Sequence, residues 1–583
     1  MEKKYQVEIQ YQDFAFTKYK NLNFDKLLVV STTNFDTLLF VNSMNVVLGY
    51  NKTGFLKPYP VDFRLNELLV KTTALPSKEI GNEDDIALPT QSDVTAKLGK
   101  LLRTFHHYFP ENFKVNKILI ISLHDDQYAE YQIDDMCIAG ELLSGKITLR
   151  ENKQPSTWLL AGNISTDRTK IEGILTCQES DPQPFLFCKR LWDMDLSFRE
   201  MAFSYCLSEG SGQFLEFNVQ AEMKKISFFQ PELVEQKISI DNLALHGTAK
   251  LMPNLLLMNP PSSIVLNGFS VPFSFSIETL SGSKNVNFRI LKNDFAFQEF
   301  RKVLPEHLFR VIPNLDITGE VESGLQLECN FAMPDQLIFN FDLSSKNLRF
   351  SDSARYFFTK YNQDFHYKYK ENGEIMKDIW VSPANDQFVS FDQIPFYMKY
   401  AILVAEDPSF FRHHGFLKSA MQESMALNLE RGSFARGGST LSMQLVKNLF
   451  LTKKKMLSRK VEEIFLVWLI EYNHLISKER MFEIYVNIIE WGPNVYGLGE
   501  ASQFYFNKPP DRLTFGECVY LATLIRSPKH YTRSLTPDGY PTDQRREEMH
   551  LIARRMYERG LVTEVQYGTF NSYIRIELTA NNE

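Results

Sequence analysis

The sequence lacks the features that mark zinc-binding, disulfide-rich, membrane-spanning and nucleic-acid-binding proteins. It has six cysteines, none in a Cys-x-x-Cys pair, which argues against a zinc site and assigns no disulfide. It has no run of about 18 apolar residues, so we expect no transmembrane helix, and its first residues lack the apolar core of a signal peptide. The net charge of -7 argues against a nucleic-acid-binding protein.

What remains is an ordinary globular composition over a long chain. Hydrophobic residues make up 44% and charged residues 23% of the sequence, as in soluble globular domains. A chain of 583 residues is too long for one hydrophobic core, so we expect two to four domains.

Residues 1–345 have the period-two pattern of β-strands. Phe217, Val219 and Ala221 alternate with polar residues. Similar stretches, rich in β-branched and aromatic residues, span residues 158–177, 238–251, 315–331 and 336–350. Apolar residues at helical spacing predict two interrupting helices, over residues 97–108 and 295–309.

These long strands, with helical segments that end in Pro-Glu before more strands, resemble AsmA/TamB-type envelope proteins. The Pro-Glu pairs are Pro110-Glu111 and Pro305-Glu306. The resemblance implies a long antiparallel sheet that handles lipid or binds other envelope or cell-wall proteins. The alternative is a β spacer that only positions the rest of the chain.

The rest of the chain is predicted to be helical. Residues 346–390 are a polar, aromatic connector, and apolar residues follow helical spacing from Ile394 to about residue 573. Pro395 suits a first helical turn. We therefore expect a domain over residues 391–583.

A carboxylate pair follows the first predicted helix, residues 396–405. Pro408 disfavours the α conformation at Asp407, so the helix should end near Glu406. A glutamate after an apolar run is a candidate general base. The alternative is a solvated helix end.

A glycine- and hydroxyl-rich stretch, Gly437-Gly438-Ser439-Thr440, precedes a predicted helix over residues 441–450. It offers an N-cap and an anion-friendly helix terminus. Thr440, Gln444 and Lys447 fall on one face of that helix, which would suit a phosphate-bearing ligand.

The next predicted helix, residues 459–470, has acidic residues in its first turn, where they suit the helix dipole. Helical periodicity does not show which of Glu462 and Glu463 belongs to a site, because each lies on a row of the helix that is apolar further along.

In order and spacing, these motifs resemble the glycosyltransferase family 51 domain of biosynthetic peptidoglycan transglycosylases and class A penicillin-binding proteins. The matching residues are Glu406, Asp407, Phe410, His413, Gly415, Gly437, Gly438, Ser439, Thr440, Gln444, Lys447, Asn448, Arg459, Lys460, Glu463, Lys478, Tyr485 and Asn487. Further matching runs continue to Pro528, so the resemblance spans roughly residues 390–535. The implied fold class is multidomain α+β, with a β-rich half followed by a lysozyme-like helical domain.

The resemblance implies that this domain polymerises lipid II. Glu406 is then the catalytic base, Glu463 the second catalytic carboxylate, and Asp407 a ligand of a divalent cation, Mg or Mn. A departing undecaprenyl diphosphate needs cations and donors. The residues implied for this donor site are Ser439, Thr440, Gln444, Lys447, Asn448, Lys455, Arg459 and Lys460.

The chain departs from the family pattern at three places. Met443 stands where a glutamine is common, and Pro408-Ser409 where charged or bulkier residues are usual. Lys455 stands where a donor-site arginine is usual, which keeps the charge and loses bidentate geometry.

We expect a monofunctional enzyme, because residues 536–583 are too few for a transpeptidase domain. Its expected location is the extracytoplasmic face of the cytoplasmic membrane. The membrane contact would be an anchor absent from this chain or an apolar surface near residues 416–429. The alternatives are a lytic transglycosylase, which needs no diphosphate site, and a non-catalytic lipid-binding scaffold. The motif from Gly437 to Asn448 argues against the lytic enzyme, and intact Glu406, Lys447 and Glu463 argue against the scaffold.

Overall fold

The computed structural model forms two compact units, Met1–Leu308 with Glu320–Ser345, and Phe309–Gly319 with Lys346–Glu583. The structure describes residues 7–18, 20–31, 37–50, 58–71, 102, 109–124, 127–151, 154–181, 185, 188–189, 192–210, 214–280, 283–371, 374–432, 437–452, 454 and 456–578.

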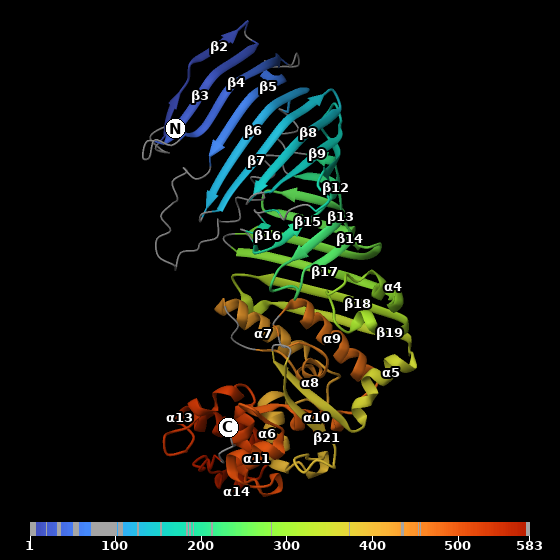
Figure 1. Cartoon of the computed structure of the whole chain (residues 1–583), viewed down its shortest axis with the longest axis vertical. Helices are drawn as coiled ribbons and strands as arrows, with labels where there is room; N and C mark the ends of the chain where they lie inside the picture. The colour runs from blue at the N-terminus through green and yellow to red at the C-terminus, as the bar shows by residue number, and fades with distance from the viewer. Residues whose placement is uncertain are drawn as a thin grey trace. The chain divides into compact units, whose positions relative to one another are not determined.

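The first unit is a long β-sheet, drawn in blue to green in Figure 1. Its strands are β1 (Val7–Gln10), β2 (Asp13–Thr17), β3 (Asn21–Ser31), β4 (Thr37–Tyr50), β5 (Pro58–Lys71), β6 (Asn112–His124), β7 (Gln127–Ala139), β8 (Leu142–Glu151), β9 (Gln154–Ile164), β10 (Lys170–Cys177), β11 (Asp195–Ser197), β12 (Glu200–Gly210), β13 (Leu215–Phe229), β14 (Ile238–Met252), β15 (Leu255–Leu266), β16 (Phe269–Leu280), β17 (Ser283–Ala296) and most of β18 (Ile317–Asn330) and β19 (Ile338–Phe350).

Strands that follow one another pair antiparallel from β6 to β10 and from β12 to β18. The exception is β5, which runs parallel to β6. The alternating pattern explains the burial of β13, where Leu215 and Phe217 are buried and Asn218 is exposed. A long antiparallel sheet is what the period-two pattern predicted.

The helix predicted over residues 295–309 is shorter in the structure. Phe295 and Ala296 still belong to β17, where they pair with β18, and α4 covers only Phe297–Val303. Strand pairing overrides the helical spacing at the start of the segment, and Pro305 disfavours helix at Leu304. The helix predicted over residues 97–108 lies outside the described residues except for Leu102.

The second unit is mostly helical and includes residues 346–390, the segment expected to be a connector. Its helices are α5 (Asp352–Thr359), α6 (Phe396–Glu406), α7 (Lys418–Arg431), α8 (Leu441–Phe450), α9 (Leu457–Tyr472), α10 (Lys478–Ile488), α11 (Leu498–Phe506), α12 (Phe515–Leu524), α13 (Asp543–Glu558) and α14 (Glu564–Gly568). Two hairpins join them, β20 (Phe365–Glu371) with β21 (Glu374–Val381) and β22 (Glu490–Gly492) with β23 (Val495–Tyr496). The predicted α+β class, a β-rich half followed by a helical domain, is confirmed.

The middle of α9 and most of α12 are buried. The apolar residues of α9 from Phe465 to Ile470 are all buried, as are those of α12 from Cys518 to Ala522. The helix predicted over residues 396–405 is α6, which is one residue longer and begins after Pro395. The helix predicted over residues 441–450 has those bounds as α8.

Two absences bear on the sequence analysis. All six cysteines lie among the described residues, and none of them forms a disulfide. Within the described ranges, no helix combines the length and the apolar character needed to cross a membrane.

Candidate active site

Glu406 is the last residue of α6, and its carboxylate lies between two donors. Gln444 Nε2 donates to Oε2 at 3.0 Å, and Arg526 Nε donates to Oε1 at 3.0 Å. The carboxylate side chain is 9% exposed. Each carboxylate oxygen can accept more than one hydrogen bond, so Glu406 is held in place and still has capacity to accept a proton.

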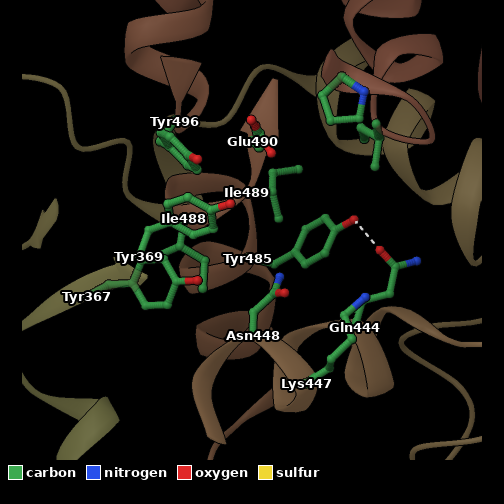
Figure 2. Close-up of a pocket in the computed structure, with 12 residues that line it drawn as sticks. Tyr367, Tyr369, Gln444, Lys447, Asn448, Tyr485, Ile488, Ile489, Glu490 and Tyr496 are labelled. Carbon is green, nitrogen blue, oxygen red and sulfur yellow. Dashed lines mark hydrogen bonds between the residues drawn. The ribbon is translucent and has the colours of Figure 1, made fainter. Parts of the chain in front are cut away.

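Tyr485 fixes the orientation of the Gln444 amide. Its hydroxyl donates to Gln444 Oε1 at 3.0 Å, the contact marked in Figure 2. Because Oε1 accepts from Tyr485, Nε2 is the atom that faces Glu406. Burial raises the pKa of Tyr485 well above its usual value, and the nearby carboxylates of Glu406 and Asp407 add to this. Tyr485 therefore stays a donor at neutral pH.

Asp407 is buried and joins the end of α6 to the start of α8. Its Oδ2 accepts from His413 Nε2 at 2.9 Å and from the backbone N–H of Leu441 at 3.1 Å. His413 Nδ1 accepts from the Gly415 N–H at 3.0 Å, which assigns the ring proton to Nε2. This carboxylate supports the fold around Glu406.

Asp407 does not fit the predicted role of metal ligand. Its Oδ1 lacks a hydrogen-bond partner, but its side chain is only 1% exposed. Magnesium keeps several waters or substrate phosphates among its ligands, and these cannot reach a buried oxygen. The described residues also contain no group of three His, Cys, Asp or Glu side chains that could hold a metal ion.

Thr440 is the N-cap of α8, as the sequence predicted, but its hydroxyl is used within the fold. It accepts from the Met443 N–H at 3.3 Å and donates to the Gly415 carbonyl. Gly415 has a φ of +97°, and a Cβ there would lie 2.3 Å from Val467 Cγ1. Of the three residues predicted to face a phosphate-bearing ligand, only Gln444 and Lys447 therefore remain candidates for binding it.

Glu463 lies in a buried cluster of charges on α9. Arg459 Nη1 donates to its Oε2 at 2.8 Å, and Lys460 Nζ donates to its Oε1 at 2.7 Å. Lys460 Nζ also donates to Ser439 Oγ at 2.7 Å. Burial lowers the pKa of Lys460, and the charge of Glu463 opposes that shift. The structure thus joins three predicted donor-site residues to the second predicted catalytic carboxylate.

Glu462 faces another part of the unit. Its carboxylate accepts three consecutive backbone N–H groups, from Arg310 at 3.0 Å, Val311 at 2.6 Å and Ile312 at 3.1 Å. Both acids are buried. The structure therefore resolves the choice that periodicity left open: Glu462 holds the 310–312 segment, and Glu463 joins the site cluster.

Gln444 and Lys447 line a pocket of about 260 Å³, shown in Figure 2. Asn448 lies beside them on α8, while tyrosines from other elements form the facing wall. The full lining is Tyr367, Tyr369, Gln444, Lys447, Asn448, Tyr485, Ile488, Ile489, Glu490, Tyr496, Ile525 and Pro528. The lysine, the two amides and the tyrosines suit a polar ligand that carries an anionic group at the Lys447 side, while Glu490 is an acidic side chain of the same lining.

Most of the remaining predicted residues support the fold, and one of them lies outside the described residues. The Asn487 amide bonds both backbone groups of Val389, at 2.9 and 2.8 Å. Phe410 is buried under the Lys478 ammonium, which is 4.3 Å from the ring centre and donates to Glu471. A Cβ at Gly438 would meet the backbone of α7 at 2.9 Å, and Gly437 before it is exposed. Lys455 lies outside the described residues.

Sequence reasoning missed Arg526 and the tyrosine wall. Arg526 follows α12 and lies within the matching region, but outside its motifs. A charged residue two positions after a mostly apolar helix was the available signal. Tyr367 and Tyr369 lie on β20, in the segment expected to be only a connector.

Residues 372–557 match the family model described as transglycosylase. The chain is 38% identical over 166 residues to a biosynthetic peptidoglycan transglycosylase of Dechloromonas aromatica, covering 28% of this chain and 71% of that protein. A Cupriavidus metallidurans protein of the same description is 35% identical over 179 residues, covering 31% and 76%. One from Acinetobacter baumannii is 38% identical over 157 residues, covering 26% and 69%.

Proposed function

The chain belongs to the biosynthetic peptidoglycan transglycosylases, and on that premise we propose that Glu406 is the base of its transfer reaction. The chain is thus a peptidoglycan glycosyltransferase of cell-wall biosynthesis, and its substrates are lipid II and the growing glycan strand. The proposal for Glu406 rests on one observation: its carboxylate is held between Gln444 and Arg526, next to the pocket that Lys447 lines.

In the proposed reaction, the 4-hydroxyl of the acceptor sugar attacks the anomeric carbon of the donor chain. Glu406 takes the hydroxyl proton while the new glycosidic bond forms. The bond from the anomeric carbon to the diphosphate oxygen breaks, and undecaprenyl diphosphate leaves with that electron pair. A hydroxyl is a weak nucleophile, so a positioned base beside it raises the rate of attack.

The leaving group carries concentrated negative charge. We assign Lys447 to this charge, with the amides of Gln444 and Asn448 as neutral donors in the same pocket. Arg459, Lys460 and Ser439 act with Glu463, whose negative charge the two cations offset. The family role of Glu463, to orient the base or the donor, is part of the proposal.

The proposed divalent cation is not assigned to Asp407, because that carboxylate is buried. Mg²⁺ binds substrate phosphates readily, so the requirement for Mg²⁺ or Mn²⁺ is proposed to come from the diphosphate itself. No step of the reaction is assigned to it.

Cell-wall synthesis places the activity in the cell envelope. The finer proposal is the extracytoplasmic face of the cytoplasmic membrane, because the lipid of lipid II keeps it in a bilayer. Exposed apolar residues on α9, Leu457 and Val461, support membrane contact. The β-sheet unit is proposed to bind lipid or an envelope partner.

The test uses the full chain with lipid II and Mg²⁺, and resolves products by size. Polymer should form with the wild type and with the exposed control Glu547→Gln, and should be lost with Glu406→Gln. Lys447→Ala should weaken donor use while thermal stability is retained. Shortened preformed glycan, with unchanged lipid II, would instead identify a lytic enzyme. Full activity of Glu406→Gln would remove Glu406 from the base role.

A further inference from the structure

Arg526 contacts the end of α6 at two points. Its Nε donates to Glu406 Oε1 at 3.0 Å, and its Nη2 donates to the Ala405 carbonyl at 2.6 Å. The last carbonyls of a helix have no partner within the helix, so Ala405 is a fixed backbone anchor for the guanidinium. One edge of this planar group is thereby tied to both the helix end and the carboxylate.

The two partners differ strongly in exposure. The side chain of Arg526 is 71% exposed, while that of Glu406 is 9% exposed. A solvent-exposed ion pair contributes little to stability. Stability alone therefore gives a weak account of an arginine at this position.

The contacts of Glu406 divide evenly over its two oxygens. Arg526 holds Oε1, and Gln444, itself fixed by Tyr485, holds Oε2. A carboxylate held at both oxygens cannot turn about its terminal bond without losing a hydrogen bond. The lone pairs that remain on the carboxylate therefore point in a fixed direction. Efficient proton transfer requires a base that is oriented in this way.

We propose that Arg526 is a positioning residue for Glu406, which orients the carboxylate by bridging it to the Ala405 carbonyl. This inference rests on the proposed role of Glu406 as the base. It adds a residue that lies 120 positions away in the sequence and acts through its contact with Glu406.

The competing explanation is a helix cap, in which Arg526 only satisfies the Ala405 carbonyl and offsets the dipole of α6. The two roles predict different effects when Arg526 is replaced. Loss of a cap lowers stability, whereas loss of positioning lowers the rate of the chemical step at constant substrate binding.

The experiment compares the full-length variants Arg526→Ala, Arg526→Gln and Arg526→Lys with Arg554→Ala. Arg554 is a matched control, because it is 66% exposed and forms a 2.8 Å ion pair with Glu558 on the same unit. Initial rates against lipid II concentration give kcat and KM, and thermal melts give Tm.

We expect Arg526→Ala to lower kcat roughly tenfold or more, with KM within about twofold and a Tm equal to that of Arg554→Ala. Arg526→Lys should recover part of kcat, because an ammonium reaches one partner but cannot bridge two. A kcat equal to wild type, a change confined to KM, or a Tm loss that parallels the kcat loss would each overturn the proposal.

A second measurement does not depend on activity. In crystal structures of wild type and Arg526→Ala, the Glu406 carboxylate should keep its Gln444 contact in the first and rotate away in the second. An unchanged carboxylate would overturn the proposal even if the wild type polymerises lipid II. If the wild type fails to polymerise, the proposed function fails, while the carboxylate orientation still reports on Arg526.

Discussion

Glu462 and Glu463 are adjacent on α9, yet their carboxylates serve different parts of the unit. Glu462 accepts three backbone N–H groups from residues 310–312, and Glu463 accepts from Arg459 and Lys460. The two side chains point to different neighbours because successive helical residues are about 100° apart around the axis. One turn of helix thus stabilises the unit and contributes a carboxylate to the site.

Glu462→Gln should destabilise the protein. An amide can accept at one atom only, so at least one of the three backbone N–H groups loses its partner; the contacts of Val311 and Ile312 are buried and that of Arg310 is partly buried. An unsatisfied buried donor costs about 1–3 kcal/mol. Urea unfolding measures the loss, with Glu547→Gln as an exposed control. Equal stability of the two variants would contradict the role given to Glu462.

Arg459 and Lys460 are the two cations that pair with Glu463. Replacing either of them by methionine should destabilise the protein, and Arg459→Met should do so more than Lys460→Met. The arginine side chain is 13% exposed and the lysine 30%, so solvent compensates the loss of the lysine better. Breaking a fully buried pair costs about 3–5 kcal/mol, and we expect Lys460→Met to fall below that range. Ser439→Ala removes only the neutral contact of Lys460 and is the milder control. The reverse order of the two methionine variants would argue against this ranking.

Tyr485→Phe should affect both stability and rate. It removes the hydrogen bond that fixes Gln444, worth about 1 kcal/mol net. The freed amide can turn away from Glu406, so kcat should fall several-fold with little change in KM. Steady-state kinetics with lipid II and a urea titration measure the two effects. Tyr557→Phe, a change at a more exposed ring on α13, should alter neither.

Stability should fall as the pH rises above about 10. Burial raises the pKa of Tyr520 to about 12 and that of Tyr485 well above its usual value. In the unfolded chain both ionise near pH 10. Between pH 10 and 12 the unfolded state therefore holds fewer protons than the folded state, so the unfolding free energy decreases with pH, by up to about 1.4 kcal/mol per pH unit and group.

Urea unfolding between pH 9 and 11 checks this, and Tyr520→Phe should flatten the slope. Lys460 and Lys478, whose pKa values burial lowers, act in the opposite direction below about pH 10.4. A stability that does not fall between about pH 10.4 and 11 would show that the tyrosines ionise equally in the folded and unfolded states.

Local signals predicted the parts of this structure that local forces decide. The end of α6 before Pro408, the bounds of α8 and the alternating strands depend on neighbours within a few residues. The order of the motifs then identified Glu406 and Glu463 as candidates, although periodicity alone could not separate Glu463 from Glu462.

Long-range contacts account for what the sequence did not reveal. Arg526 is 120 residues from Glu406, and the partners of Glu462 are about 150 residues away. Thr440 shows another limit, because helical spacing placed it with Gln444 and Lys447. An N-cap side chain folds back onto its own helix, so its hydroxyl is used before any ligand arrives.

The transferase unit cannot be excised by a cut at the start of its family match or at residue 346. The family match begins at residue 372, but the three backbone donors of Glu462 come from residues 310–312. A fragment that starts at residue 346 or 372 would leave a carboxylate buried on α9 without those donors, directly beside Glu463. An expression fragment for crystallography or inhibitor screening must therefore retain residues 309–319, either with the 320–345 stretch that follows them or rejoined by a short designed linker.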